Sequence, residues 1–76
     1  MKELVETIAK ALVAYPDDVK VTESVQGDQV NIELRVNSLD MGKVIGKQGR
    51  IAKAIRSVVK AAGTKTGQKT SVDILQ

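Results

Sequence analysis

The sequence predicts a small α+β domain in which helices cover one face of a three-stranded mixed sheet. Residues 30–36 alternate apolar and polar side chains, which is the pattern of a strand with one buried face. A glycine-bounded hinge at residues 46–49 separates two stretches whose apolar residues have helical spacing. The expected order is helix, strand, strand, helix, helix, strand, in one domain over residues 1–76.

The composition excludes several kinds of site. Cysteine and histidine are absent, so the chain offers no disulfide, no thiolate metal site and no imidazole base. Tyr15 is the only aromatic residue, so the core must be aliphatic. We therefore expect no enzyme activity, no metal, no cofactor and no small-molecule substrate.

The hydropathy of the chain predicts a cytoplasmic protein. No run approaches the roughly 18 apolar residues of a membrane span. The N-terminal residues alternate charged and apolar side chains, so they lack the unbroken apolar core of a signal peptide. We expect neither a membrane span nor a secretory leader.

The first predicted helix covers residues 2–14. One of its faces carries apolar residues with Val5 at its edge, and these are Leu4, Ile8, Ala11 and Leu12. Pro16 is expected to end the helix, because proline disfavours helical geometry in the residue before it. This helix is expected to serve packing and to carry no site.

A hairpin of two strands is predicted next. Three valines between residues 19 and 25 lie on one face of the first strand, and Glu23 interrupts that face. Residues 26–29 have turn chemistry, with Gly27 available for a positive φ. The alternating residues 30–36 supply the second strand.

A short helix, a tight glycine turn and a longer helix are predicted to follow. Ser38 or Asp40 is expected to cap the short helix, which carries Val44. The longer helix is expected to run from about residue 49 to 62. Its apolar stripe is made of Ile51, Ile55, Val58 and Val59.

The chain is expected to end in a loop and a third strand. Gly63 is the expected C-terminal stop of the long helix, and residues 64–69 are expected to form a polar loop. Val72 and Ile74 then alternate with polar residues. A right-handed crossover would place this strand parallel to the strand at residues 30–36.

Positive charge is concentrated in the second half of the chain. Residues 1–42 carry four basic and eight acidic side chains, whereas residues 43–76 carry eight basic side chains and one acidic. The net charge of +3 therefore conceals a basic stretch with no acid between Asp40 and Asp73. Such an uneven distribution of charge is typical of a surface that binds a polyanion. A basic helix is often only a solvated face, but the adjacent glycine hinge favours binding.

The glycine hinge allows three phosphate or nucleic-acid interpretations. A Walker A loop needs four residues between its glycines and then Gly-Lys-Ser/Thr, but three residues separate Gly42 from Gly46, and Gln48 replaces the hydroxyl residue. A dinucleotide fingerprint needs G-x-G-x-x-G, whereas the glycine spacings here are four and three. Both are excluded. The remaining interpretation is the G-x-x-G loop of a KH domain, which clamps about four nucleotides by their backbone.

Residues 44–51 resemble the KH signature, in which a hydrophobic pair precedes G-K-x-G and a helix starts with a basic residue and isoleucine. The helix-first order resembles a type II KH domain. Residues 41–56 and the chain length resemble the KhpA family of small bacterial single-KH RNA-binding proteins. This resemblance implies binding of single-stranded RNA, with RNA-chaperone activity or post-transcriptional regulation. It also implies a homodimer or a heterodimer with a larger, multidomain KhpB-like protein, and a link to cell shape and cell-wall homeostasis.

The candidate RNA-binding residues lie in and beside the hinge. Gly46 and Gly49 allow a sugar-phosphate backbone to approach closely, since neither has a Cβ atom. Backbone N–H groups at the start of the second helix are expected to add partial positive charge. Ile45 is expected to be partly exposed where bases lie. The full predicted set is Lys43, Ile45, Gly46, Lys47, Gln48, Gly49, Arg50 and Lys53.

The basic stripe and Gly42, both beside the hinge, each allow two interpretations. Lys53, Arg56 and Lys60 recur at spacings of three and four, so they form a stripe that either attracts the polyanion or is simply solvated. Gly42 allows either close packing or close approach of RNA. The sequence does not choose between them.

The scarcity of aromatic residues predicts weak binding by one domain. Stacking on aromatic side chains is worth about 1–3 kcal/mol per base, and this chain offers almost none. Association with a second RNA-binding chain would raise the effective affinity. Two alternatives remain: a protein-interaction or dimerisation module on a KH scaffold with incidental nucleic-acid binding, and binding of single-stranded DNA.

Overall fold

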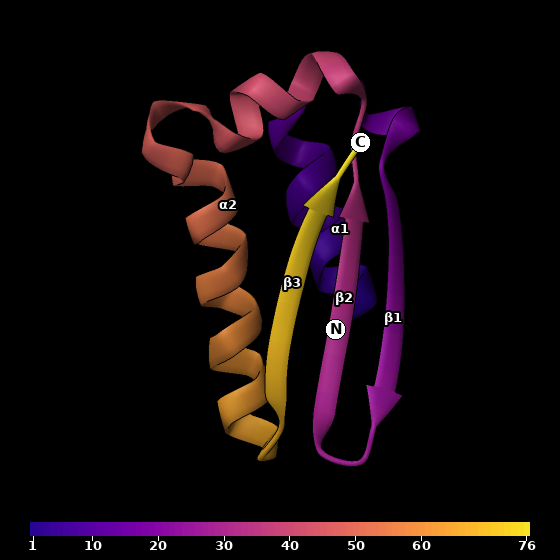
Figure 1. The fold of residues 1–76 in the computed structure, drawn as a ribbon, viewed down its shortest axis with the longest axis vertical. Coiled ribbons are helices and arrows are strands. Elements are labelled where there is room, and N and C mark those ends of the chain that lie inside the picture. The colour runs from indigo at the N-terminus through magenta and orange to yellow at the C-terminus, as the bar shows by residue number, and fades with distance from the viewer.

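Helices and strands follow one another along the chain in the predicted order (Figure 1). The computed structural model describes the backbone of residues 1–76 and all side chains except those of Lys47 and Gln48. The elements are α1 (Lys2–Leu12), the 3₁₀ turn η1 (Pro16–Asp18), β1 (Lys20–Gln26), β2 (Gln29–Arg35), α2 (Ser38–Thr66) and β3 (Lys69–Leu75).

The three strands form one mixed sheet in the order β1-β2-β3. β1 and β2 run antiparallel, with Val21 opposite Leu34. β2 and β3 run parallel, with Ile32 opposite Val72. In Figure 1, α1 lies behind the sheet, and α2 crosses above its end and descends beside β3. The predicted α+β architecture and mixed sheet are confirmed.

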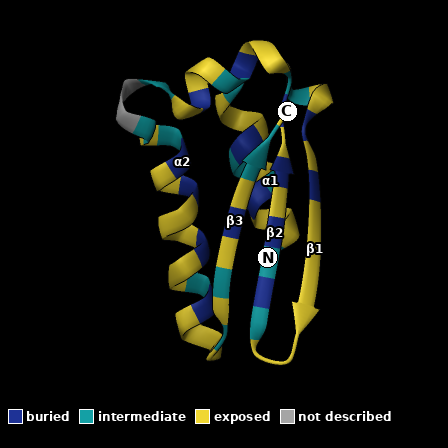
Figure 2. Cartoon of the chain, viewed as in Figure 1, coloured by how far each residue is buried: buried dark blue, intermediate teal, exposed yellow. Residues whose placement is uncertain are grey.

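The core is aliphatic and lies between the sheet and the helices (Figure 2). Alternate residues of β2 point into it, as the sequence pattern predicts. The predicted stripe of the long helix needs one correction, because Val58 is 37% exposed while Ala52 is buried. The buried hydrophobic residues are Val5, Ala9, Val19, Val21, Val30, Ile32, Leu34, Val36, Val44, Ala52, Ile55, Val59 and Val72.

The end of α1 differs from the prediction. α1 ends at Leu12, two residues earlier than expected, and the next residue is already extended with φ −102° and ψ 159°. The backbone N–H groups of Ala14 and Tyr15 donate to the two carboxylate oxygens of Asp40, at 2.9 and 3.0 Å. These N–H groups are therefore not available to helical hydrogen bonds. A side chain distant in the sequence therefore holds the segment between α1 and Pro16, which begins η1.

Glu23 interrupts the apolar face of β1 because it serves the N-terminus of α1. Its Oε2 accepts a hydrogen bond from the backbone N–H of Lys2 at 3.0 Å and lies 3.7 Å from the N-terminal ammonium of Met1. An acidic group at this end of a helix is favoured by the helix dipole. Further along the same face, Val25 is 55% exposed and does not join the core.

The N-terminal cap of α2 also differs from the prediction. The side chain of Asn37 accepts a hydrogen bond from the N–H of Leu39 at 2.8 Å, so Asn37 is the cap rather than Ser38 or Asp40. Asp40 is 1% exposed, because its carboxylate binds the segment that follows α1.

α2 spans 29 residues, but its ribbon changes direction along its length (Figure 1). The φ of Gly49 is +68°, in the left-handed region that other residues rarely adopt. We call residues 38–48 the first arm and residues 50–66 the second arm; they correspond to the predicted short and long helices.

In the described part of the chain, no helix is long and apolar enough to cross a membrane.

The second arm ends later than predicted. It continues to Thr66, and Gly67 is its C-cap with a φ of +74°. Gly63 is not the stop but lies inside the helix, where a Cβ atom would be 2.5 Å from Cγ2 of Thr70. The predicted polar loop at residues 64–69 therefore consists mostly of helix and cap.

Candidate nucleic-acid interface

The two arms of α2 are anchored in the core on either side of the hinge. Val44 is 1% exposed and packs the first arm into the core. Ile55 and Val59 are 1% and 0% exposed and pack the second arm into the core. Because both arms are fixed, the segment between them forms the corner seen in Figure 1. The predicted hinge is therefore present, with its positive φ at Gly49.

A groove of about 620 Å³ lies between the two arms, and we call it the arm groove. Gly42, Lys43 and Gly46 line it from the first arm, and Arg50 and Ile51 line it from the second. Lys43 and Arg50 are exposed, so positive charge reaches the groove from both arms. None of the described residues that line it is acidic. The arm groove is thus suited to an anion.

Gly42 and Gly46 contribute no side chains to the arm groove. Among the described residues, and apart from the adjoining helix backbone, a Cβ atom at either position would meet no heavy atom within 4 Å. Packing within the chain therefore does not require glycine at these positions, although glycine inside a helix costs about 0.5–1 kcal/mol relative to alanine. Of the two roles considered for Gly42, close packing is not supported by its surroundings.

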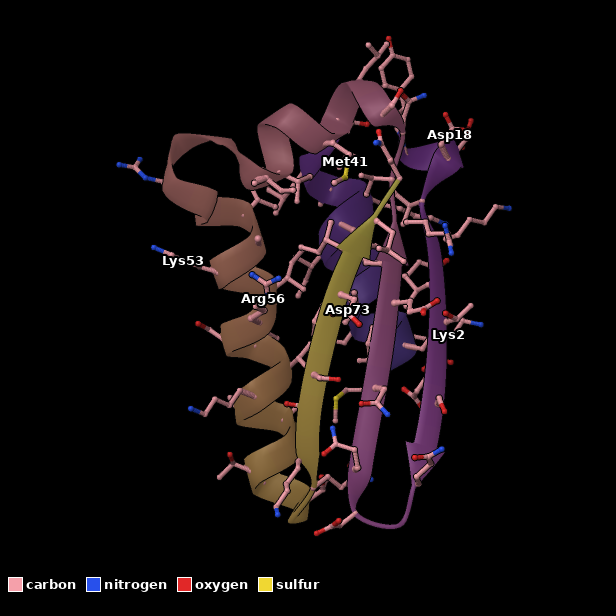
Figure 3. All side chains as sticks on the ribbon, viewed as in Figure 1. Lys2, Asp18, Met41, Lys53, Arg56 and Asp73 are labelled. Carbon is pink, nitrogen blue, oxygen red and sulfur yellow. The ribbon has the colours of Figure 1, made fainter. Side chains whose placement is uncertain are left out.

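The other predicted residues lie around the hinge. Ile45 is 52% exposed, as expected, but it is not among the described residues that line the arm groove. Ile51 is half-buried and does line it. Lys53 is exposed and points away from the sheet (Figure 3). The side chains of Lys47 and Gln48 lie outside the described residues.

The predicted contribution of backbone N–H groups at the start of the second arm stays a prediction. Gly49 has a φ of +68°, so the second arm begins directly after a left-handed residue. Lys43 and Arg50 supply positive charge to the arm groove next to this point.

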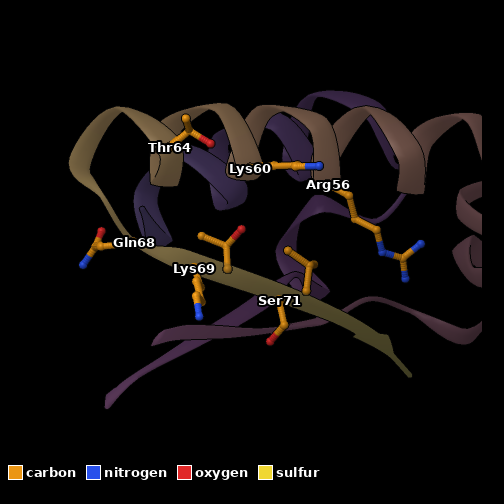
Figure 4. A pocket seen from close by; sticks show the side chains of 8 residues that line it. Arg56, Lys60, Thr64, Gln68, Lys69 and Ser71 are labelled. Atoms are coloured by element: carbon orange, nitrogen blue, oxygen red, sulfur yellow. The ribbon is translucent and has the colours of Figure 1, made fainter. Parts of the chain in front are cut away.

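The predicted basic stripe is divided by the structure. Arg56 and Lys60 lie beside a second hollow of about 610 Å³, which we call the α2–β3 seam (Figure 4). Lys53 is not among the described residues that line this seam. The residues that line it are Arg56, Lys60, Thr64, Gln68, Lys69, Thr70, Ser71 and Val72.

Asp40 fastens the first arm to the end of α1. Its two carboxylate oxygens accept the backbone N–H groups of Ala14 and Tyr15, 26 and 25 residues away. Asp40 lies two positions before Gly42, so this contact also fixes the arm that carries the groove glycine. The sequence carried no signal for it, because the donors are ordinary backbone groups.

Comparison with known proteins shows the family. The family model described as "KhpA/KhpB, KH domain" matches residues 2–74. The "RNA-binding protein KhpA" of Clostridium perfringens is 60% identical over 75 residues, which are 99% of this chain and 100% of that protein. The protein of the same name from Aquifex aeolicus is 49% identical over 77 aligned positions, which cover 100% of this chain and 96% of that protein. The one from Listeria monocytogenes is 46% identical over 76 positions, which cover 100% of both chains. No solved structure matches the chain.

These matches agree with the architecture. The family model covers nearly the whole chain, and the α-β-β-α-α-β order with a mixed three-stranded sheet is that of a type II KH fold. The chain therefore belongs to the KhpA/KhpB family of KH domains.

Proposed function

We propose that the chain binds single-stranded RNA by holding the sugar-phosphate backbone against the hinge of α2. The arm groove carries this proposal: cations from both arms and two glycines without a packing role surround one open groove beside the left-handed Gly49. The relatives' name, "RNA-binding protein KhpA", supports RNA as the polyanion. On this proposal a single KH domain over residues 1–76 contains the whole site, with the G-x-x-G loop at residues 46–49.

In the proposed complex, cationic and apolar groups have different roles. Lys43 and Arg50 contact phosphates, and Lys47 and Gln48 contribute further backbone contacts from the loop. The apolar side chain of Ile51 offers surface to sugars and bases inside the groove. Contacts to phosphates position a strand but do not read its sequence. We therefore expect little base preference.

Residues outside the arm groove play a smaller part in this proposal. Ile45 is exposed and apolar, so it is available to a base that leaves the groove. Lys53 adds long-range attraction, because it is exposed and lies one helical turn beyond Arg50.

The proposed binding is weak for one copy of the chain. Tyr15, the single aromatic residue, is not among the described residues that line the arm groove, so strong stacking is not provided there. We propose that a homodimer or a heterodimer with a KhpB-like protein supplies further RNA contacts and raises affinity by multivalency. The family that matches the chain includes KhpA and KhpB domains, which fits such a pairing.

We propose that the cellular role is RNA-chaperone or post-transcriptional activity in the cytoplasm. Weak and sequence-tolerant binding suits a protein that must release RNA readily. A link to cell shape and cell-wall homeostasis rests on the family resemblance alone. We propose no catalytic role, since the relatives are named for RNA binding and the chain lacks histidine and cysteine.

The proposal is tested by titrating a fluorescent single-stranded RNA with the wild type and with Lys47→Asp/Gln48→Asp over a range of salt concentrations. We expect the wild type to bind, with a slope of log K against log salt of about −0.7 for each phosphate engaged. We expect the double variant to lose binding, because two carboxylates repel the backbone. Single-stranded DNA of the same sequence tests selectivity for RNA.

A matched control separates the hinge from overall charge. Lys20→Asp/Gln26→Asp changes the net charge by the same amount at two exposed positions of β1. Circular dichroism must show that both variants are folded. If the hinge variant binds as tightly as this control, the hinge does not hold the RNA and the proposed mechanism is wrong. If the wild type binds no RNA at any salt concentration, RNA binding by the isolated chain is rejected.

A further inference from the structure

Three exposed apolar side chains lie where the end of α1 meets the start of α2. Leu12 is 38% exposed, Tyr15 44% and Leu39 72%. Apolar residues exposed singly are common on protein surfaces and need no function. These three, however, belong to two segments that the carboxylate of Asp40 joins, through the backbone N–H groups of Ala14 and Tyr15. They are therefore gathered at one junction of the fold.

Leu39 continues the face of the first arm that lines the arm groove. The groove residues Gly42, Lys43 and Gly46 follow it by three, four and seven positions, which is the spacing of one helix face. At 1.5 Å per residue, Leu39 lies about 5 Å before Gly42 and about 11 Å before Gly46 along the axis. A strand that leaves the arm groove along the first arm would therefore meet Leu39 next.

Hydrogen bonds hold the backbone at Tyr15 and at Leu39. Tyr15 donates its N–H to Oδ2 of Asp40 at 3.0 Å, and its carbonyl oxygen accepts the N–H of Asp18 at 3.1 Å. Leu39 donates its N–H to the side chain of Asn37 at 2.8 Å. Because the backbone is already fixed at both residues, a ligand does not have to order it, which favours binding.

Tyr15 is the only aromatic residue of the chain, and the fold leaves it exposed instead of placing it in the core. An aromatic ring stacks on any nucleobase, because every base has a π-face. Leu39 adds apolar surface from the neighbouring segment, and contact with a base would remove that surface from water. The chemistry at this junction therefore matches a nucleobase.

The charges around Tyr15 favour a base over a phosphate. Asp17 and Asp18 follow Tyr15 in the chain, and both are exposed. Their carboxylates repel a phosphate but not a neutral base. Lys43 lies four residues after Leu39 on the same face of the first arm, so it can hold the phosphate that joins this base to the strand in the arm groove. The junction therefore suits one base at the end of the bound strand.

We infer that Tyr15 and Leu39 form a stacking subsite for one nucleobase of an RNA strand that extends from the arm groove along the first arm. This inference rests on the proposed function of the hinge. An apolar segment of a protein would also match the exposed side chains. The helix face that Leu39 shares with Gly42 and Lys43 instead favours a strand continuous with the arm groove. The subsite contributes stacking rather than charge.

The test uses an RNA of four nucleotides, which a KH loop can clamp, extended by two nucleotides at its 5′ or its 3′ end. Each extension is made once with bases and once with abasic residues, which keep the phosphates. We expect the base-bearing form of one extension to bind about tenfold more tightly than its abasic form, as removal of one stacked base predicts. The two forms should have the same slope of log K against log salt, because they carry the same phosphates.

Variants of the two residues separate stacking from apolar bulk. Tyr15→Phe keeps an aromatic ring and should keep the tenfold difference, whereas Tyr15→Leu should lose it. Leu39→Ala should reduce the difference. Its matched control is Val25→Ala, which shortens an apolar side chain that is 55% exposed on β1 and should keep the difference. All four variants should bind the four-nucleotide RNA as the wild type does, and circular dichroism shows whether they are folded.

Tyr15 also reports on the subsite directly, because the aromatic fluorescence of the protein comes from this residue alone. At saturation we expect the base-bearing extension to quench this fluorescence more than its abasic form does. If Tyr15→Leu keeps the tenfold difference, or weakens the four-nucleotide RNA equally, the subsite is rejected while the hinge proposal stands. If Tyr15→Leu keeps that difference and only dissociates an oligomer in sedimentation, the junction is instead a contact between copies. If the wild type binds none of these RNAs, both proposals fall.

Discussion

Two glycines within α2 have opposite surroundings. At Gly63 a Cβ atom would lie 2.5 Å from Cγ2 of Thr70 and 2.9 Å from the carbonyl oxygen of Gln68, so the fold itself requires glycine. At Gly42 a Cβ atom would meet nothing within 4 Å, and the residue lines the arm groove. No described contact requires glycine at position 42, and access of RNA to the groove is the role that we propose for it.

We predict that Gly42→Ala stabilises the chain and weakens RNA binding. Alanine is favoured over glycine inside a helix by about 0.5–1 kcal/mol, and the added methyl group would meet none of the described atoms beyond the adjoining helix backbone. The same methyl group would occupy the arm groove. We expect a midpoint of thermal unfolding that rises by several degrees, at about 4–8 °C per kcal/mol. In RNA titrations we expect a loss of about tenfold, which is about 1.4 kcal/mol.

Ser57→Ala is the control for this variant, because Ser57 is exposed on the second arm and lines neither the arm groove nor the seam. It should raise stability slightly and leave RNA binding unchanged. A Gly42→Ala protein that binds RNA as tightly as the wild type would show that the strand does not approach this side of the groove.

At the scale of elements, Gly63 determines how closely the second arm approaches β3. We predict that Gly63→Ala destabilises the chain by about 1 kcal/mol. Overpacking is expected to destabilise it by about 1–3 kcal/mol, whereas the higher helix propensity of alanine stabilises it by at most about 1 kcal/mol. Urea unfolding of the wild type and the variant measures the difference in the free energy of unfolding. The same substitution thus has opposite effects on stability at Gly42 and Gly63.

The Gly63 prediction can be checked by a second substitution. Thr70→Ser removes the Cγ2 atom that would lie 2.5 Å from the new methyl group, although the carbonyl oxygen of Gln68 at 2.9 Å remains. Gly63→Ala should therefore lower the free energy of unfolding less in the Thr70→Ser background than in the wild type. If it lowers this free energy equally in the two backgrounds, the strain does not come from contact with Cγ2 of Thr70.

Local patterns predicted the elements but not their ends. The alternation in β2 and the hinge glycines are local signals, so the order of elements and the turn at Gly49 could be predicted. The end of α1 depends on Asp40, which is far away in the sequence. α2 ends at the left-handed Gly67, and sequence alone does not distinguish Gly63 from Gly67 as a helix stop.

The candidate site was predictable to a similar degree. The motif indicated Lys43, Gly46 and Arg50, and the structure brings these three residues to one groove. The seam was not predicted, because it depends on how the second arm is rotated against β3. Only a tertiary contact decides that Arg56 lines the seam while Lys53 points away from the sheet.

At the scale of the whole molecule, the charge asymmetry of the sequence becomes an asymmetry in space. The acidic half of the chain forms α1, β1 and β2, whereas the basic half forms nearly all of α2 and β3. α2 descends beside β3, at the edge of the sheet opposite β1 (Figure 1). The arm groove and the seam therefore lie in one positive region, whose field can steer a polyanion toward both.

Asp40 joins the two halves of the molecule. It is the one buried charged residue among the described side chains, and it connects the first arm of α2 to the chain after α1. Its two oxygens each accept one backbone N–H group, so both acceptors are needed. Removal of either would leave a part-buried N–H group without its carboxylate partner, and a hydrogen bond to a charged group contributes about 1.5–3 kcal/mol.

We predict that Asp40→Asn lowers the free energy of unfolding by about 1–3 kcal/mol, because the amide supplies one acceptor oxygen where the carboxylate supplied two. Asp17→Asn, at an exposed position of η1, should change stability little. Amide hydrogen exchange locates the effect: Ala14 and Tyr15 should lose protection before the amides of β2 do. Equal loss of protection throughout the chain would mean that Asp40 supports the fold as a whole. Faster exchange confined to these amides, with weaker RNA binding, would mean that the carboxylate holds the first arm in the position that the arm groove requires.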